Sequence, residues 1–378
     1  MEHLRLALVE SCIDSYEGPS LENVKIIGVQ HILETTHAMF RSLYRLGLKP
    51  ENVSLIGKCY STCQEVYEEM LADGIDVSSG STAYNSHQSY DNLFAEEVKS
   101  FLLDHIPDLS SGRYEQIIVL DDGGKCINFI NDYLTHLPPV FAIEQTSSGY
   151  EAIKNSHLRL PVINVARSPI KLTLESPMIA EAAAERLYQS LERKELFPKE
   201  ALIIGGGAIG NAMSRRLSSK MNITIFDKNK SLNNTGSLEL PQIIPSFSLI
   251  IGCTGKTSIS HDLHPNISPG TSLVSVSSSD REFDAVHLRK QIDKNNNCHE
   301  DLLIHDVLLV RSGFPVNFDG ERENIDPELI QLTIALITSG ILQARTSRLG
   351  ISNGIHPLDP KAEHKIETEF LNSRTQLI

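Results

Sequence analysis

The stretch ALIIGGGAIG at residues 201–210 has the pattern of a strand, a glycine turn and the start of a helix. Its apolar half predicts a buried strand, and the glycines of the turn follow the spacing G-x-G-x-x-G. Between a strand and a helix, these glycines allow a tight turn, a close approach of a pyrophosphate group, and close packing of the helix on the strand. The candidate cofactor residues of the turn are Gly205, Gly207, Ala208, Ile209 and Gly210.

A second strand pattern, NITIFDKN at 222–229, follows the turn and ends near Asp227. A carboxylate at this position accepts hydrogen bonds from a ribose diol and repels a 2′-phosphate, so it favours NAD over NADP. Thr254 and Gly255 follow a later strand and are expected to line the same cleft. The alternative interpretation is a glycine turn that only packs a helix on a strand. We expect a Rossmann domain that binds NAD as its cofactor.

Short β-rich runs alternate with helical patterns on both sides of this turn. Continuous Val, Ile and Leu runs separated by helices are typical of a parallel sheet covered on both faces, so the predicted fold class is α/β. The predicted strands lie within 24–30, 52–57, 115–122, 138–145, 160–166, 201–204, 222–229, 248–255, 272–280 and 301–310.

A chain of 378 residues is long enough for two domains. A helical pattern from Pro177 to about Lys194 separates two sets of strands, and a last helical pattern over 327–346 is expected to return to the first domain. We therefore expect a parallel-sheet substrate domain formed by 1–176 plus 327–350, with an inserted Rossmann NAD-binding domain at 178–326. Residues 351–378 are expected to be a C-terminal tail. The apolar density of 327–346 predicts burial against one domain or at a subunit contact, so we expect a homo-oligomer.

The composition narrows the range of partners. With 34 Lys and Arg against 48 Asp and Glu, the formal charge is −14, which argues against nucleic acid and against an anionic membrane surface. No apolar run approaches the roughly 18 residues that span a bilayer. The N-terminus lacks the pattern of a secretory signal, and six cysteines are too few for a disulfide framework, so we expect a cytoplasmic protein. Cys59 and Cys63 have no partner pair at a metal-site spacing, so we expect no metal.

Polar residues stand at or near the ends of predicted strands in the first domain. Such groups face the cleft where α/β proteins bind ligands, because the carboxyl ends of parallel strands lie at one edge of the sheet. Lys171 and Glu175 are four residues apart and would share a helix face, where an ordinary surface salt bridge is the alternative interpretation. The other members are His31, the pair Asp121-Asp122, and the stretch EQTSSG at 144–149.

In order and spacing, these segments resemble the S-adenosylhomocysteine hydrolase family nearly from end to end. VLDDGG at 119–124 is similar to that family's Leu-Asp-Asp-Gly-Gly segment, and EQTSSG to its Glu-Glu-Thr-Thr-Thr-Gly loop. The other matching segments are GVQHILETTHAMFRSLYRLGL at 28–48, Ser61-Thr62, INVARSPIKLTLES at 163–176, and VNF at 316–318.

The resemblance implies a small-molecule nucleoside substrate and a reaction that uses NAD transiently. Oxidation at C3′ of the ribose acidifies the C4′ hydrogen, the 5′ thiolate is eliminated, water adds, and the hydride returns. The resemblance assigns the 3′-hydroxyl proton to Lys171 with assistance from Glu175, and the leaving group and water to His31 and Asp122. It also implies cofactor contacts by Thr146, Ser147, Ser148 and Asn317, and substrate contacts by Thr35, Ser61, Thr62, Glu144 and Gln145.

Several positions differ from the family pattern, chiefly those that recognise the base. Gln145 stands where the family has an acidic residue, and Leu33 and Thr35 stand where it has Thr and Glu. Three functions therefore stay open. The first is hydrolysis of S-adenosylhomocysteine or a close thioether nucleoside. The second is an NAD-dependent oxidation, elimination or epimerisation of another nucleoside or sugar-like alcohol. The third is a non-catalytic nucleotide-binding protein derived from the family.

Overall fold

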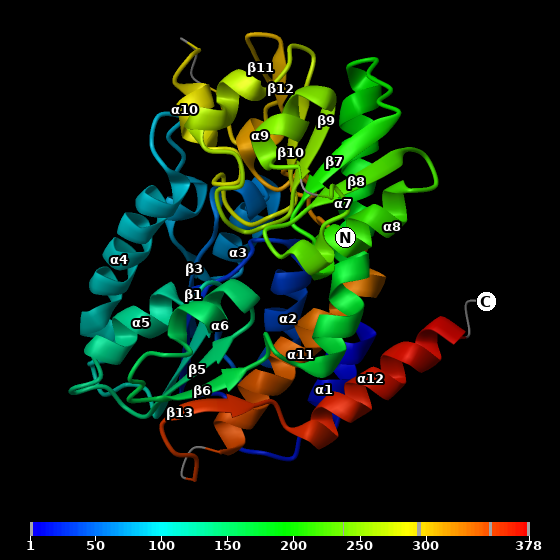
Figure 1. Ribbon diagram of the computed structural model, residues 1–378. Coiled ribbons are helices and arrows are strands. Elements are labelled where there is room, and N and C mark those ends of the chain that lie inside the picture. The colour runs from blue at the N-terminus through cyan, green and yellow to red at the C-terminus, as the bar shows by residue number, and fades with distance from the viewer. Residues whose placement is uncertain (1–2, 237, 293–295, 348–349, 376–378) are drawn as a thin grey trace. The chain divides into compact units, whose positions relative to one another are not determined.

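The computed structural model describes residues 3–236, 238–292, 296–347 and 350–375. The chain divides into two compact units (Figure 1). Unit 1 comprises 1–83, 94–175 and 326–378, and unit 2 comprises 84–93 and 176–325. The predicted α/β class is confirmed, because each unit contains a mainly parallel sheet connected by helices. Some residues of the predicted domains lie outside the described residues. In the predicted substrate domain and tail these are 1–2, 348–349 and 376–378, and in the predicted NAD domain they are 237 and 293–295.

Unit 1 is built on a seven-stranded sheet with the order β13-β6-β5-β4-β1-β2-β3, in which every pair is parallel. The strands are β1 (Val24–Val29), β2 (Val53–Ile56), β3 (Asp76–Val77), β4 (Gln116–Asp121), β5 (Val140–Glu144), β6 (Pro161–Asn164) and β13 (Gly354–Pro357). The helices that lie wholly or partly in unit 1 are α1 (Ala7–Asp14), α2 (Glu34–Tyr44), α3 (Gln64–Ala72), α4 (Tyr90–Leu109), α5 (Lys125–Asp132), α6 (Ser147–Ile153), α7 (Pro169–Arg193), α11 (Pro327–Thr346) and α12 (Pro360–Thr375).

The predicted C-terminal tail is wrong, because the segment after residue 350 is part of the unit 1 core. β13 pairs with β6 in parallel, from Gly354 opposite Pro161 to Pro357 opposite Asn164. α12 then packs on α11 and α1, with Ile366 and Phe370 buried. An edge strand of four residues is too short to recognise without the neighbour that supplies its hydrogen bonds.

Helix α11 is the central helix of unit 1. It contacts β4, β5 and β6 and also α1, α2 and α12, so Figure 1 shows an orange helix beside dark-blue helices from the other end of the chain. Within the described residues it is the one helix that satisfies the length and hydropathy of a membrane span, contrary to our sequence expectation that none approaches it. Since 72% of that window is buried inside the structure, α11 has the character of a core helix.

Unit 2 contains a six-stranded sheet with the order β11-β12-β10-β9-β7-β8. Alternate residues of β7 enter two separate cores, Ala201 and Ile203 on one face and Leu202 and Ile204 on the other, so this sheet is covered on both faces. The strands are β7 (Glu200–Ile204), β8 (Asn222–Phe226), β9 (Leu249–Gly252), β10 (Ser272–Ser275), β11 (Leu302–Ile304) and β12 (Val307–Leu309), and the α-helices that lie wholly in the unit are α8 (Ala208–Leu217), α9 (Leu240–Ile243) and α10 (Ala285–Arg289).

Two predicted elements differ from the structure. The single strand expected over 301–310 is an antiparallel hairpin of β11 and β12, because His305 and Asp306 both adopt positive φ and form a two-residue turn. The helix expected from Pro177 starts at Pro169 and includes Pro177 in its interior. A proline removes one backbone donor, but α7 continues through Pro177 to Arg193.

Candidate functional site

The glycine turn after β7 has the geometry of a dinucleotide cradle. Gly205 has φ of 105°, and a side chain at Gly210 would overlap the carbonyl oxygen of Gly205, so the helix lies directly against the turn. Gly207 caps α8, and a Cβ built there would meet nothing within 4 Å. The turn therefore leaves free space at the helix N-terminus, beside Ala208 and Ile209, where a pyrophosphate can approach the backbone.

Asp227 follows β8 and lies next to this turn. Its Oδ2 accepts a hydrogen bond from the Gly206 N–H at 2.7 Å, and its Oδ1 accepts one from the Asn229 N–H at 2.7 Å. Each carboxylate oxygen has a second lone pair that a ribose hydroxyl can use. The residues present thus fit the adenosine half of NAD at the carboxyl ends of β7 and β8.

Thr254 and Gly255 follow β9, but their polar atoms are turned into the protein. The buried Glu282 carboxylate accepts hydrogen bonds from Thr254 N at 2.5 Å and from Gly255 N at 2.6 Å, and the Thr254 hydroxyl lies 3.0 Å from it. These two amides are therefore engaged by Glu282, and the segment packs closely against Gly205. Asn317 is buried near the end of β10, where Val316 N donates to Ser275 O.

The sheet of unit 1 has a topological switch point between β1 and β4. The chain proceeds from β1 to β2 and β3 on one side, and then crosses to β4, β5 and β6 on the other. In open parallel sheets, ligands bind outside the carboxyl ends of the strands at such a point. The side chains that follow the strand ends there are Gln30 and His31 after β1, Lys58 and Ser61 after β2, Asp122 after β4, and Gln145 after β5.

Asp122 is the centre of this cluster. Its carboxylate forms a buried ion pair with Lys58, accepts a hydrogen bond from Gln145 Nε2 at 2.9 Å, and lies 3.2 Å from His31 Nε2. Burial by itself would raise the pKa of Asp122, but the Lys58 ammonium and His31 outweigh it and hold the pKa well below its usual range. Asp122 therefore stays ionised at neutral pH, and it can orient and stabilise a proton donor but cannot itself supply a proton.

His31 connects Asp122 to Ser61. Because the Asp122 carboxylate is an acceptor, we assign the ring hydrogen to Nε2, and Nδ1 then accepts from the Ser61 hydroxyl at 2.6 Å. The exposed fraction of the His31 side chain is 28%, whereas that of Asp122 is 4%. His31 is thus the member of this cluster through which a proton can reach a ligand. The structure thus brings together four of the predicted site residues, His31, Asp122, Ser61 and Gln145.

The predicted proton-transfer pair lies on α7 in unit 1. Lys171 and Glu175 occupy one face of this helix and form an ion pair, and the Thr333 hydroxyl donates to Glu175 at 3.1 Å. Lys171 is buried, so the pair is not an ordinary surface salt bridge. A lysine and a carboxylate in direct contact can pass a proton between them, which is the chemistry that the resemblance assigned to them.

Several predicted contact residues are directed into the protein. Glu144 is fully buried and accepts from Thr146 N and Thr146 Oγ1, each at 2.7 Å, so its observed hydrogen bonds are internal to the protein. Contact of Glu144 with a substrate stays a prediction. Thr35 and Thr62 are buried as well, and the Thr62 hydroxyl donates to Lys58 O at 2.9 Å.

The predicted cofactor residues of the EQTSSG stretch begin α6 in unit 1. Thr146 caps this helix by accepting from Gly149 N at 3.0 Å, and Ser147 and Ser148 lie on its first turn. Their hydroxyls belong to unit 1, whereas the glycine turn belongs to unit 2. Contact of these three residues with a cofactor stays a prediction.

Sequence reasoning missed Lys58, Gln30 and Glu282. Gln30 Nε2 donates to Gln145 Oε1 at 2.9 Å and so extends the Asp122 network. The sequence signal that could have identified Lys58 is its position relative to a strand. Lys58 comes two residues after β2, just as His31 comes two residues after β1. In the sequence, Lys58 cannot be distinguished from a surface lysine, because only the strand order shows that it lies beside Asp122.

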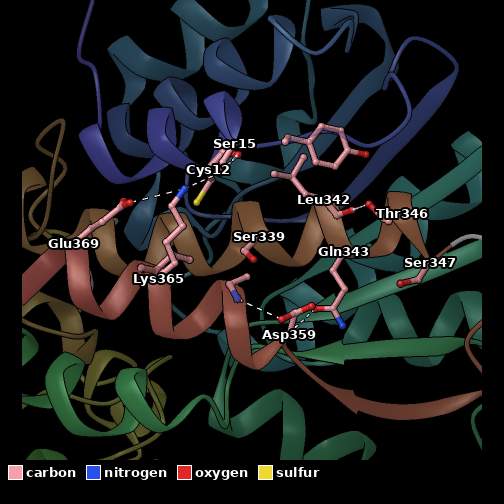
Figure 2. A pocket seen from close by; sticks show the side chains of 13 residues that line it. Cys12, Ser15, Ser339, Leu342, Gln343, Thr346, Ser347, Asp359, Lys365 and Glu369 are labelled. Atoms are coloured by element: carbon pink, nitrogen blue, oxygen red, sulfur yellow. Dashed lines mark hydrogen bonds and ion pairs between the residues drawn. The ribbon is translucent and has the colours of Figure 1, made fainter.

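The cavity in Figure 2 lies elsewhere in unit 1, among α1, α11 and α12. It has a volume of about 250 Å³ and is lined by residues that include Cys12, Gln343 and Lys365. The Lys365 ammonium already donates to Ser15 Oγ at 2.8 Å, and Gln343 Oε1 accepts from Asp359 N at 2.8 Å. This cavity contains none of the predicted site residues. Among the described residues, no group of three or more His, Cys, Asp or Glu side chains could hold a metal ion.

Comparisons with known proteins identify relatives but no activity. No family model matches the chain. Solved structures that resemble it include NAD⁺-bound 3-phosphoglycerate dehydrogenase of Entamoeba histolytica, at 12% identity and a TM-score of 0.40 over 85% of this chain and 95% of that one. The dipicolinate synthase A chain of Bacillus subtilis has 11% identity and a TM-score of 0.41, over 86% and 96%.

Two curated sequences of Mycobacterium tuberculosis are far more similar. They are "Uncharacterized protein MT0113" of strain CDC 1551 and "Uncharacterized protein Rv0104" of strain H37Rv. Each is 41% identical over 363 residues, which cover 93% of this chain and 70% of the relative. The chain belongs to the same family as these two mycobacterial proteins.

Proposed function

We propose that the chain is an NAD-dependent oxidoreductase that acts on a secondary alcohol of a nucleoside-like or sugar-like substrate. The observation that carries this proposal is the glycine turn, where Gly207 faces free space and Gly210 has no room for a side chain. Asp227 beside the turn supports NAD as the cofactor. Unit 1 supplies a second polar cluster at its own switch point, which suits a small polar ligand.

The reaction would convert a carbinol to a ketone, with loss of one hydride and one proton. When bound, NAD supplies the hydride acceptor. The Lys171–Glu175 pair would take the hydroxyl proton: Lys171 would pass its own proton to the Glu175 carboxylate as it receives the proton of the hydroxyl group, since the two groups are in contact and Lys171 is shielded from water. Asp122 would hold His31 in one orientation, so that His31 can donate to or accept from a second substrate group.

The test is a titration of the purified protein with NAD and with NADP by calorimetry, followed by assays of candidate alcohols for reduced nicotinamide. We expect saturable binding of NAD that is tighter than binding of NADP. Absence of saturable NAD binding would overturn the proposal.

Replacing Asp227 with Asn is expected to change the ratio of NAD to NADP affinity by about tenfold or more towards NADP, because the carboxylate that repels a 2′-phosphate is lost. The measurement is the dissociation constant of each cofactor. Asp262→Asn is the matched control, since Asp262 is an exposed carboxylate of the same unit. An unchanged ratio in Asp227→Asn would remove Asp227 from the cofactor site.

A second candidate function is hydrolysis of a thioether nucleoside such as S-adenosylhomocysteine. The observations that favour it are the His31–Asp122 contact and the Lys171–Glu175 ion pair, which join residues that the resemblance assigned to the same reaction. In this reaction water and the thioether yield a free thiol and a 5′-alcohol, with no net oxidation. Release of thiol from S-adenosylhomocysteine, followed with a thiol reagent, distinguishes this function from a net oxidation.

Replacing Lys171 with Gln is expected to lower turnover about 100-fold or more in either reaction, because a group that transfers the hydroxyl proton is removed. NAD affinity should change far less than turnover, since the glycine turn expected to receive the pyrophosphate contains neither Lys171 nor Glu175. Lys154→Gln provides the control, as Lys154 forms an exposed ion pair with Glu151. Equal turnover in Lys171→Gln and the unsubstituted protein would show that Lys171 is not the proton acceptor.

A further inference from the structure

Two carboxyl groups that the proposed reaction does not use lie at the ends of neighbouring strands in unit 1. Asp121 is the last residue of β4 and Glu144 the last of β5, and they are direct partners in the parallel register. Both side chains are fully buried. Side chains of register partners project on the same face of a sheet, so the two carboxyl groups are neighbours.

In each carboxyl group, one oxygen accepts hydrogen bonds and the other has no hydrogen-bond partner. Asp121 Oδ2 accepts from Ile127 N at 2.8 Å, and Glu144 Oε1 accepts from Thr146 N and the Thr146 hydroxyl. Asp121 Oδ1 and Glu144 Oε2 are buried and have no hydrogen-bond partner. Gly149 makes room for this arrangement, since a Cβ there would overlap the Glu144 carboxyl group.

We infer that Asp121 and Glu144 share one proton between these two oxygens, and that the pair is a positioning element for Asp122 and Gln145. Two adjacent buried carboxylates cannot both remain ionised, because the donors that reach them offset only part of their desolvation and mutual repulsion. A single proton supplies the donor that both free oxygens lack and leaves the pair with one negative charge.

The surrounding charges agree with one retained proton. Burial raises the pKa of Asp121 to about 7. The Asp122 carboxylate adds to this rise, whereas the Ile127 N–H and the Lys58 ammonium oppose it. Burial and then Asp121 raise the pKa of Glu144 well above its usual value. The other titratable groups that act on the pair are Asp122, Lys58 and the buried Cys126 thiol. Lys58 is committed to Asp122, so it does not neutralise the second carboxylate.

The position of the pair explains its effect on the site. Glu144 Oε1 also accepts from Gly123 N at 3.4 Å, so it links the loop after β4 with the loop after β5. These loops carry Asp122 and Gln145, which hydrogen-bond to each other at 2.9 Å. Loss of the last proton would place a second negative charge behind Asp122 and would separate the two loops by repulsion.

The test uses the full chain and the isosteric variants Glu144→Gln and Asp121→Asn. An amide in either place keeps the acceptor oxygen and puts an N–H where the shared proton lies. In the unsubstituted protein we expect an infrared carbonyl band of a protonated carboxyl group at neutral pH, and we expect each variant to lack it. Glu151→Gln, an exposed glutamate of unit 1, should retain the band.

Thermal unfolding provides the second readout. A carboxyl group whose pKa is raised in the folded state stabilises the protein below its unfolded pKa, and that stability is lost as pH rises through the folded pKa. The unfolding midpoint of the unsubstituted protein should therefore fall by about 5 °C or more between about pH 5 and pH 8. Glu144→Gln should remove most of this decline, and Glu151→Gln should not.

If Glu144→Gln fails to fold, Asp121→Asn answers the same question from the other strand. The double variant is expected to be less stable than either single variant, because two N–H groups then face each other without an acceptor. A carboxyl band that is absent from the unsubstituted protein, or that persists in both single variants, would overturn the inference. So would an equal pH-dependent decline in the unsubstituted protein and Glu144→Gln.

Discussion

Replacing Lys58 with Met is expected to lower the free energy of unfolding of unit 1 by about 3 kcal/mol or more, since it leaves the buried Asp122 carboxylate without its cation. The corresponding fall in the unfolding midpoint is about 6–12 °C. The measurement is thermal unfolding at neutral pH. His31 and Gln145 remain beside Asp122, but neither supplies the full charge that Lys58 provides.

The double variant Lys58→Met with Asp122→Asn should recover much of this loss, because no buried charge is then left unpaired. Lys154→Met is the control for removing a lysine from an exposed ion pair, and its effect should stay below about 1 kcal/mol. If Lys58→Met unfolds at the same temperature as the unsubstituted protein, the Lys58–Asp122 pair does not stabilise the switch point of unit 1.

Replacing Gly207 with Ala is expected to weaken NAD binding about 100-fold while the unfolding midpoint without ligand stays unchanged. Gly207 has φ of −70°, which alanine adopts without strain, and the added Cβ meets nothing within 4 Å. The methyl group would instead occupy the space that a pyrophosphate needs in order to reach the N-terminus of α8. Calorimetric titration with NAD and thermal unfolding without it measure the two quantities separately.

Two further glycines serve as comparisons for this variant. Gly350→Ala also places a methyl group in open space, but in unit 1, and it should change neither NAD affinity nor unfolding. Gly210→Ala would overlap the Gly205 carbonyl oxygen, so it should destabilise unit 2 itself. Unchanged NAD affinity in Gly207→Ala would place the cofactor away from this turn.

The local parts of the fold were predictable because their signals are contained in short segments. The strand, turn and helix of 201–217 follow from an apolar run and three spaced glycines, and β1, β4 and β5 follow from buried Val, Ile and Leu runs. The hairpin of β11 and β12 was not predictable in this way, since His305 and Asp306 do not indicate a two-residue turn as Asn-Gly does.

Of the candidate site, the sequence predicted the polar residues that follow strand ends and face other site residues. His31 and Asp122 stand at strand ends, and the structure places them in contact. Glu144 stands at a strand end too, yet its side chain is fully buried, and its register partner is the equally buried Asp121. A strand pattern does not state which neighbour a strand has, and the neighbour decides whether a carboxyl group meets a ligand or another carboxyl group.

The sequence by itself determined the α/β class, the glycine turn with Asp227 nearby, and the acidic character of the chain, because each depends on residues close together or on composition. The tertiary structure alone decided that Lys58 neutralises Asp122, that Asp121 meets Glu144, and that β13 completes the sheet of unit 1. These contacts join residues from different strands, and the strand order that creates them depends on the packing of the whole unit. Electrostatic interactions between buried groups depend on that order, so the protonation of this site is a property of the fold.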